Sequence, residues 1–357
     1  MIDLSLLPDG GMGWLDASGA KGSIVLSTRI RLARNLQGYP FGQRARDADR
    51  SAVLTQVEEA AAASDRLAGA VTFRLDQMDR LDRQLLHERH LVSKELAGLD
   101  RDTRPRAGAA LLVHGVVGIM VNEEDHLRLH GMRSGFALEE AYAELEAADA
   151  DLGRLLAFAF HPEFGYLTSC PTNAGTALRA SVLIHLPGLV LTKEIGKVLQ
   201  GLSQVGLTFR GLYGEGSEVV GNFFQLSNQT TLGKSEEELL DHLGKIVRQV
   251  VEYEEQAREI LLREATTIVA DKVWRAYGTL RHARTLTFEE AMNLLSGVRL
   301  GAGLNLIPGP SVYTLNKLLI FTQPAHLAAL EGRATGDPEL STARATYVRR
   351  VLDAEAG

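Results

Sequence analysis

The stretch from Tyr166 to His185 contains the single cysteine of this 357-residue chain, Cys170. Turn-forming residues follow Cys170, and the apolar run 180–186 after them predicts a buried strand. A thiol at such a turn, beside a hydroxyl such as that of Thr172, can act as a reactive thiolate. The alternative is a small core side chain, because free cysteine is among the most buried residue types. The stretch by itself favours that alternative.

Arg29 and Arg31 lie in a second chemically suggestive segment, 23–34, whose pattern predicts a strand. Residues two apart in a strand project from the same face. Two guanidinium groups on one face suit an oxyanion. The alternative, which this pair alone favours, is a solvated strand face.

Glu123, Glu124 and Asp125 are consecutive carboxylates that follow the predicted strand 116–121. Like charges this close repel one another, so they need a cation to offset them. The alternative is a solvated acidic turn.

One phosphate-binding motif can be rejected. Gly233, Lys234 and Ser235 match the end of a P-loop, but its first glycine would fall at Asn228. Ser235 and Glu238 instead form a capping-box pattern before a long helix.

The remaining patterns predict a mixed α/β part followed by helices alone. Further strands are expected at 70–75, 109–114, 207–210 and 219–226. Helices are expected at 49–63, 76–90, 137–158 and 191–204, with a short additional helix capped by Ser93. The last third predicts helices at 236–264, 266–279, 288–298, 311–321 and 340–354.

The composition sets the broad class. A hydrophobic content of 45% over 357 residues suffices for a large core and two domains. The net charge of −7 argues against nucleic-acid partners, and one cysteine excludes a disulfide framework. The chain begins without signal-peptide features and has no apolar run of membrane-spanning length. We therefore expect a cytoplasmic protein without membrane partners.

Five motifs, in the order found in phosphagen (guanidino) kinases, together resemble that family. They are Ser27-Thr-Arg-Ile-Arg31, Asn122-Glu-Glu-Asp-His-Leu-Arg128, Cys170-Pro-Thr-Asn-Ala-Gly-Thr176, Arg179-Ala-Ser181 and Arg210-Gly211. The resemblance implies an α/β (α+β) fold. Its catalytic domain has a mainly antiparallel sheet flanked by helices, and an all-helical C-terminal domain follows here.

The resemblance implies ATP as the phosphoryl donor, with Mg²⁺ carried by the nucleotide and no metal held by the protein. Its arginines would stabilise charge spreading over the transferred group, and its histidine would pack against adenine. The implied ATP-binding residues are Ser27, Thr28, Arg29, Ile30, Arg31, His90, Arg128, Arg179, Ala180, Ser181, Val182, Leu183, Arg210, Gly211, Leu212, Tyr213, Gly214 and Glu215.

The resemblance also implies the acceptor site. A guanidinium is cationic and therefore a poor nucleophile, so carboxylates must hold it and take a proton. Glu124 matches the family's catalytic base, Glu215 its second substrate carboxylate, and Cys170 its reactive cysteine, whose thiolate Thr172 could stabilise. In this context the functional interpretation of Cys170 is favoured. The roles of the two carboxylates beside Glu124 stay open.

Two departures from related enzymes are informative, one from the small-molecule guanidino kinases and one from the bacterial protein arginine kinases. Those enzymes carry a helical domain before the first motif, whereas only 26 residues precede Ser27 here. The arrangement resembles the bacterial protein arginine kinases, the McsB group, over nearly its full length. That group often has an Arg-Asp-x-x-Arg-Ala motif for phosphoarginine feedback, but the segment 340–345 keeps only Arg344 and Ala345. We therefore do not expect that feedback.

The implied function is ATP-dependent phosphorylation of arginine side chains in proteins, in stress regulation and in marking proteins for degradation. The expected domains are a catalytic domain, 1–255, and a helical dimerisation or regulatory domain, 256–357. The implied partners are protein substrates, an activator protein, a transcriptional repressor, a Clp-type protease and a second copy in a homodimer. Two alternatives stay open: a kinase of free arginine or another small guanidine, and a kinase-like regulatory binding protein.

Overall fold

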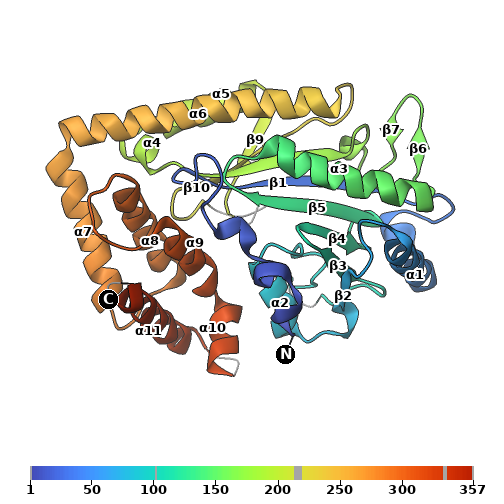
Figure 1. The fold of residues 1–357 in the computed structure, drawn as a ribbon, viewed down its shortest axis with the longest axis horizontal. Coiled ribbons are helices and arrows are strands. Elements are labelled where there is room, and N and C mark those ends of the chain that lie inside the picture. Colours follow the sequence, from blue (N-terminus) through green and yellow to red (C-terminus); the bar gives the residue numbers. More distant parts are fainter. Residues whose placement is uncertain (1, 101–102, 213–218, 333–335, 356–357) are drawn as a thin grey trace.

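The computed structural model describes residues 2–100, 103–212, 219–332 and 336–355. An eight-stranded antiparallel sheet forms its centre (Figure 1), in the order β2-β3-β4-β5-β1-β8-β10-β9. The strands are β1 (Val25–Arg34), β2 (Val71–Arg74), β3 (Ala110–His114), β4 (Val117–Val121), β5 (Leu127–Ser134), β8 (Leu178–His185), β9 (Leu207–Arg210) and β10 (Phe223–Asn228). A separate hairpin pairs β6 (Phe160–His161) with β7 (Gly165–Tyr166). The sheet confirms the expected fold class.

Helices cover one face of the sheet and form a second group beside it (Figure 1). The helices that accompany the sheet are α1 (Asp47–Ala63), α2 (Arg80–Glu88), α3 (Leu138–Leu155), α4 (Pro187–Leu191), α5 (Ile195–Gln204) and α6 (Glu236–Glu264). The C-terminal group is α7 (Thr266–His282), α8 (Phe288–Gly303), α9 (Val312–Phe321), α10 (Pro324–Glu331) and α11 (Asp337–Glu355). Short 3₁₀ turns occur at Leu4–Leu6, Pro8–Gly11, Gly13–Leu15, Gly42–Arg44, Leu75–Gln77 and Pro171–Asn173.

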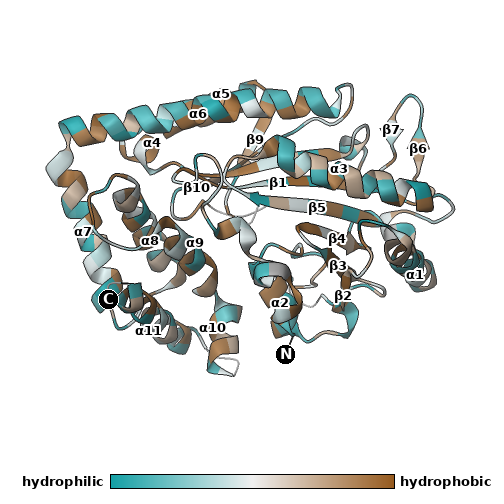
Figure 2. Cartoon of the chain, in the orientation of Figure 1, coloured by the Kyte–Doolittle hydropathy of each residue, from teal (hydrophilic) through white to brown (hydrophobic). Residues whose placement is uncertain are grey.

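The two faces of the sheet have different chemistry because strand side chains alternate. On β1, Ile30 and Leu32 are buried in the main core beneath α3 and α6. Arg29 and Arg31 are the intervening residues and project from the other face. Colouring by hydropathy shows apolar residues running along the strands and inward helix faces (Figure 2). The fold therefore places a row of charged side chains on the face that α3 and α6 leave uncovered.

Local capping fixes the helices against the sheet. The buried hydroxyl of Thr28 donates to the carbonyl of Gly135 at 2.8 Å and accepts from the amide of Ala137 at 3.0 Å, immediately before α3. The predicted capping box of α6 is present: Ser235 Oγ accepts from the Glu238 amide at 3.2 Å, and Glu238 accepts from the Ser235 amide at 2.8 Å. These bonds satisfy amide groups that a helix start leaves unpaired.

Several element predictions were wrong in detail. The helix expected at 191–204 is two helices, because Lys193 adopts a left-handed φ of +62° between α4 and α5. The segment after Ser93 is a turn, although Ser93 Oγ does accept from the Leu96 amide at 3.1 Å. Helix α2 begins only at Arg80, since the carboxylate of Asp79 caps the Asp82 amide at 2.8 Å.

Two further elements were misplaced or missed. The strand expected at 219–226 begins at Phe223, after a left-handed turn at Gly221 and Asn222. Helix α10 was not predicted, because its short run of alanine and leucine lacks a polar face.

The helical group shares a hydrophobic core with the sheet. This second core combines Val273 and Leu295 from α7 and α8 with Leu26 and Leu183 from the sheet. Helix α6 crosses the expected boundary at 255/256 without interruption, and its Leu261 joins the second core. The domain division at residue 255 stays a prediction.

Candidate active site

Four arginines from three adjacent strands lie on the uncovered face of the sheet. In the antiparallel register, Arg31 of β1 stands opposite His130 of β5 and Arg179 of β8. Arg29 stands two residues along β1, and Arg128 of β5 stands opposite Ala33. Directly opposed residues of neighbouring strands share a face, so the register gathers side chains that lie far apart in the sequence.

The arginine cluster concentrates positive charge. Burial lowers the pKa of Arg31 well below its ordinary value, and Arg128, Arg29 and Arg179 lower it further. Burial and Arg128 lower the pKa of Arg29 to about 10. Among the described residues, the buried Nε atoms of Arg29 and Arg31 have no hydrogen-bond partner. Guanidinium groups held in this way fit the oxygens of phosphate groups, which would supply the missing acceptors and charge.

Glu123 offsets part of that charge. Its carboxylate is buried and lies 2.5 Å from the guanidinium of Arg128. Burial raises the pKa of Glu123, but Arg128 and the neighbouring groups outweigh it, so the pKa is lowered overall. Glu123 in turn raises the pKa of Arg128. The structure therefore gives Glu123 a positioning role for Arg128, a role that the sequence had left open.

Asp125 joins two distant motifs. Its Oδ1 accepts from the Asn35 side chain at 2.6 Å and from the amide of Ser169 at 2.6 Å. The hydroxyl of Ser169 also donates to the carbonyl of Glu124 at 2.8 Å. These bonds hold the segment that carries Cys170 against the acidic motif, so Asp125 is a positioning residue.

Glu124 and the segment of Cys170 are consequently held close together. The Glu124 residue is exposed, whereas its two acidic neighbours are buried. Cys170 is partly exposed, and its Sγ lies 3.0 Å from the hydroxyl of Thr172. A cysteine serving only as a core side chain would be buried. Gly175 adopts a φ of +101° and a Cβ there would meet the backbone of Thr231, so the turn after Cys170 requires glycine at this position.

A small cavity adjoins the arginine cluster. It is lined by Trp14, Ser27, Arg29, His90, Met132, Ser181, Leu183, Leu212 and Gln225. The rings of Trp14 and His90 meet edge to face, with centroids 5.3 Å apart. Burial, and then Arg29, lower the pKa of His90 well below its ordinary value, so its imidazole is neutral. The cavity has a volume of about 20 Å³, which is room for one water molecule, so its aromatic lining, and not its present volume, suits a nucleotide base.

Trp14 is the residue of this cavity that the sequence patterns least indicated. It is buried, and within the described chain its indole Nε1 has no hydrogen-bond partner. The first 22 residues show only turn-forming patterns, so the sole signal was an isolated tryptophan between glycines and a leucine. Met132 and Gln225 were missed for a related reason, because only the strand register brings them to the cavity.

The other residues expected to bind ATP lie at different places on the sheet. The side chains of Thr28, Ile30, Ala180 and Val182 lie on the helix-covered face, so they can reach a nucleotide only through their backbone. Arg210 pairs with Gln225 at the sheet edge, next to the buried Gly211 and Leu212. Tyr213, Gly214 and Glu215 lie outside the described residues.

Within the described residues, the structure offers neither a metal-binding cluster nor a membrane-spanning helix. Across the described ranges, no group of three or more histidine, cysteine, aspartate or glutamate side chains is arranged to hold a metal ion. No helix in the described part of the chain has the length and apolar character needed to cross a membrane.

Comparisons with known proteins define the family. Residues 52–257 match the family model for the ATP:guanido phosphotransferase C-terminal catalytic domain, and residues 266–356 match that for the protein-arginine kinase McsB C-terminal domain. The protein-arginine kinase of Symbiobacterium thermophilum is 46% identical over 96% of both chains. That of Desulforamulus reducens is 42% identical over 95% of both chains. The chain belongs to the ATP:guanido phosphotransferase family, within its protein-arginine kinase branch.

A solved structure shows the same fold. The duplicated taurocyamine kinase of Schistosoma mansoni, with bound transition-state analogue components, is 26% identical and superimposes with a TM-score of 0.58. The similarity covers 75% of this chain and 41% of that one.

Proposed function

We propose that this protein transfers the γ-phosphoryl group of ATP to arginine side chains of other proteins. The observation that carries the proposal is the cluster of arginine side chains on one sheet face, together with the bond from Ser169 that holds the Cys170 segment against Glu124. Its relatives over nearly the full length are protein-arginine kinases.

The nucleotide site follows from the two adjoining features. Arg29, Arg31, Arg128 and Arg179 bind the phosphates, and Arg210 approaches them from the sheet edge. The base packs against Trp14 and His90, whose small cavity must widen to admit it. Mg²⁺ would be carried on the phosphates and would neutralise charge there. Because the guanidinium groups are fixed before ATP arrives, they stabilise the charge that spreads over the transferred group.

The acceptor site lies at the acidic motif. Glu124 orients the substrate guanidinium and takes its proton as the nitrogen attacks the γ-phosphorus, while the bond to the β,γ-bridging oxygen breaks. Cys170 lies beside the guanidinium in this proposal, with its Sγ 3.0 Å from the hydroxyl of Thr172. Glu215 supplies a second carboxylate in this proposal, which rests on the family resemblance alone.

The exposure of Glu124 favours a protein acceptor, because a side chain can reach it from a large partner. The fold similarity to a taurocyamine kinase favours a second candidate, a kinase of free arginine or another small guanidine. A kinase-like regulatory binding protein would hold nucleotide without turnover.

The wider biological role is also part of the proposal. Protein substrates follow from the activity itself, whereas an activator, a transcriptional repressor, a Clp-type protease and roles in stress and degradation rest on the resemblance. We place the enzyme in the cytoplasm, since its chemistry uses a free thiol. A homodimer formed through residues 256–357 stays a prediction, which light scattering at micromolar concentration tests.

The mechanism is tested with Glu124→Gln, which keeps the size of the side chain but cannot take a proton. We expect phosphoryl transfer to fall by at least about 100-fold, as for loss of a general base, with ATP affinity changed less than about twofold. Glu140→Gln, at an exposed carboxylate of α3, is the matched control and should retain full activity. Near wild-type turnover by Glu124→Gln would show that the assigned base is wrong.

A further inference from the structure

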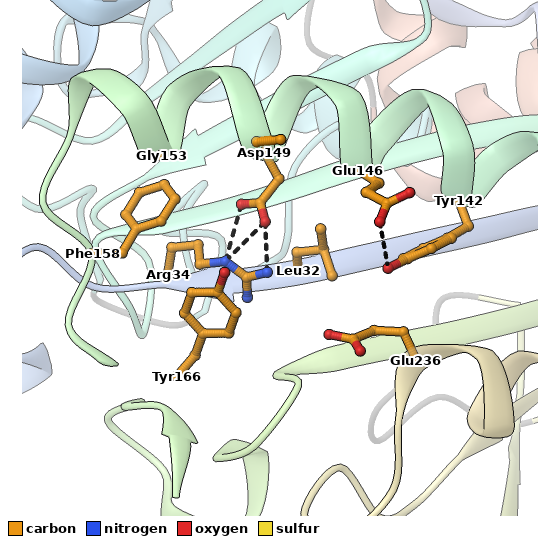
Figure 3. Close-up of a pocket in the computed structure, with 10 residues that line it drawn as sticks. Leu32, Arg34, Tyr142, Glu146, Asp149, Gly153, Phe158, Tyr166 and Glu236 are labelled. Atoms are coloured by element: carbon orange, nitrogen blue, oxygen red, sulfur yellow. Dashed lines mark hydrogen bonds and ion pairs between the residues drawn. The ribbon is translucent and has the colours of Figure 1, made fainter. Parts of the chain in front are cut away.

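A second cavity, of about 210 Å³, lies on the opposite face of the sheet from the arginine cluster. Figure 3 shows it between α3, β1, Tyr166 of β7 and Glu236 at the start of α6. Leu32 and Arg34 contribute from β1, and they alternate with the residues that face the nucleotide site. The proposed phosphoryl transfer makes no use of this cavity.

One guanidinium is already built into the cavity wall. Arg34 is 2% exposed, and its Nε and Nη2 donate to Asp149 at 3.0 and 2.7 Å. Its Cζ lies 3.4 Å from the centre of the Tyr166 ring. Its Nη1 donates to the carbonyls of Ala33 and Thr176. Asp149 therefore offsets the charge of Arg34, and a carboxylate and an aromatic face bind that guanidinium.

Two more carboxylates line the cavity without a matching cation. Glu146 projects from α3 and accepts from the hydroxyl of Tyr142 at 3.4 Å, while Glu236 points in from the opposite side (Figure 3). Neither carboxylate has an ion pair within the described residues. Burial raises the pKa of Tyr142 far above its ordinary value, and Glu236 and Glu146 raise it further. The cavity therefore carries an excess of negative charge.

We infer that this cavity is a second binding site for a guanidinium group, presented by an arginine side chain of a protein or by free arginine. Glu146 and Glu236 accept hydrogen bonds from opposite sides, which suits the planar, forked guanidinium better than an ammonium. Phe158 and Tyr142 provide aromatic surface for the stem and the cation. Pockets for drug-sized ligands span roughly 300–1,000 Å³, so about 210 Å³ suits one side chain.

The site is also connected to the segment that carries Cys170. Arg34 bonds to the carbonyl of Thr176, and the amide of Tyr166 donates to the carbonyl of Gly175 at 2.8 Å. Tyr166 and Arg34, which line the cavity, are therefore bonded to the turn that follows Cys170. The binding inference stands independently of the catalytic proposal.

The test is calorimetric titration of the full-length protein, without ATP, with Nα-acetylarginine amide and with free arginine. The site variant is Glu146→Gln/Glu236→Gln. The matched control is Glu139→Gln/Glu237→Gln, which removes two exposed charges from the same two helices. We expect the site variant to bind one equivalent fewer of the arginine compound than the wild type and the control do. Alternatively, it binds that equivalent of the compound at least tenfold more weakly. Thermal melting of all three proteins establishes that they are folded.

Each outcome decides the inference. Equal stoichiometry and affinity in the site variant and the control would overturn it, as would equal binding of Nα-acetyllysine amide. Binding of the blocked arginine identifies a protein side chain as the source, and binding of free arginine alone identifies the amino acid. If the active site itself bound no arginine, the total amount of ligand bound would be lower for all three proteins. The site variant would still bind one equivalent fewer than the wild type and the control.

Discussion

At the scale of single residues, arginine side chains gather on one face of the sheet. Arg31 stands between His130 and Arg179, and Glu123 offers a carboxylate to the cluster through Arg128. The sequence shows that Arg29 and Arg31 share a face, because alternation along one strand fixes that. It does not show what lies across the strand, because pairing depends on segments far away in the chain.

Cys170 provides the first prediction at this scale. Iodoacetamide should alkylate Cys170 and inactivate the enzyme, and ATP with an arginine peptide should slow the reaction. Thr172→Val should slow alkylation about fivefold, because a hydrogen bond of about 1 kcal/mol to the sulfur is lost. Thr55→Val, at an exposed threonine of α1, serves as the control. A Cys170 that stays inert to iodoacetamide in the native protein would contradict its role.

Trp14 provides the second prediction at the scale of single residues. Trp14→Phe keeps an aromatic ring in the base cavity but removes the buried N–H, so ATP affinity should fall about fivefold. Trp274→Phe changes the chain's other tryptophan, which is exposed, and should leave the affinity unchanged. In Trp274→Phe the remaining fluorescence comes from Trp14 and should respond to nucleotide. An unchanged dissociation constant in Trp14→Phe would remove Trp14 from the site.

At the scale of elements, the strongest sequence patterns predicted the structure best. The segments 207–210 and 23–34 correspond closely to β9 and β1, because alternation and flanking turns mark both. Helix ends were less accurate where a local conformation decided them, as at Lys193. Order and register of the sheet could not be predicted from periodicity, since they arise from tertiary packing. The base cavity depends on that register and was correspondingly missed.

Helix α2 is tied to the C-terminal group by a buried carboxylate. Glu88 accepts from the amides of Ala325 and His326 at the start of α10, at 2.9 and 3.1 Å, and lies 2.8 Å from His326 Nδ1. Glu88→Ala would leave these donors unpaired, so we expect about 3 kcal/mol less free energy of unfolding. Urea unfolding measures this free energy, and Glu95→Ala, at an exposed position, is the control. Equal stability of the two variants would show that this contact does not stabilise the fold.

At the scale of the whole molecule, the N-terminal segment links the proposed nucleotide site to the helical group. Asn316 of α9 donates to the carbonyl of Leu15 at 3.0 Å, next to Trp14 in the base cavity. Arg299 of α8 donates to the carbonyls of Ser23 and Gly22, immediately before β1. The C-terminal helices therefore support both the base cavity and the strand that carries Arg29 and Arg31.

The identity of the acceptor tests the central claim most directly. The enzyme is incubated with ATP and either free arginine or an unfolded arginine-containing protein, at equal guanidinium concentration. Phosphoarginine, which is acid-labile, is then quantified by mass spectrometry under neutral conditions. The same protein with every arginine replaced by lysine is the control substrate, and Glu124→Gln is the control enzyme. We predict phosphoarginine on the protein, at least about tenfold faster than on free arginine, and none with either control. Efficient phosphorylation of free arginine, with no phosphoarginine on the protein, would contradict the account.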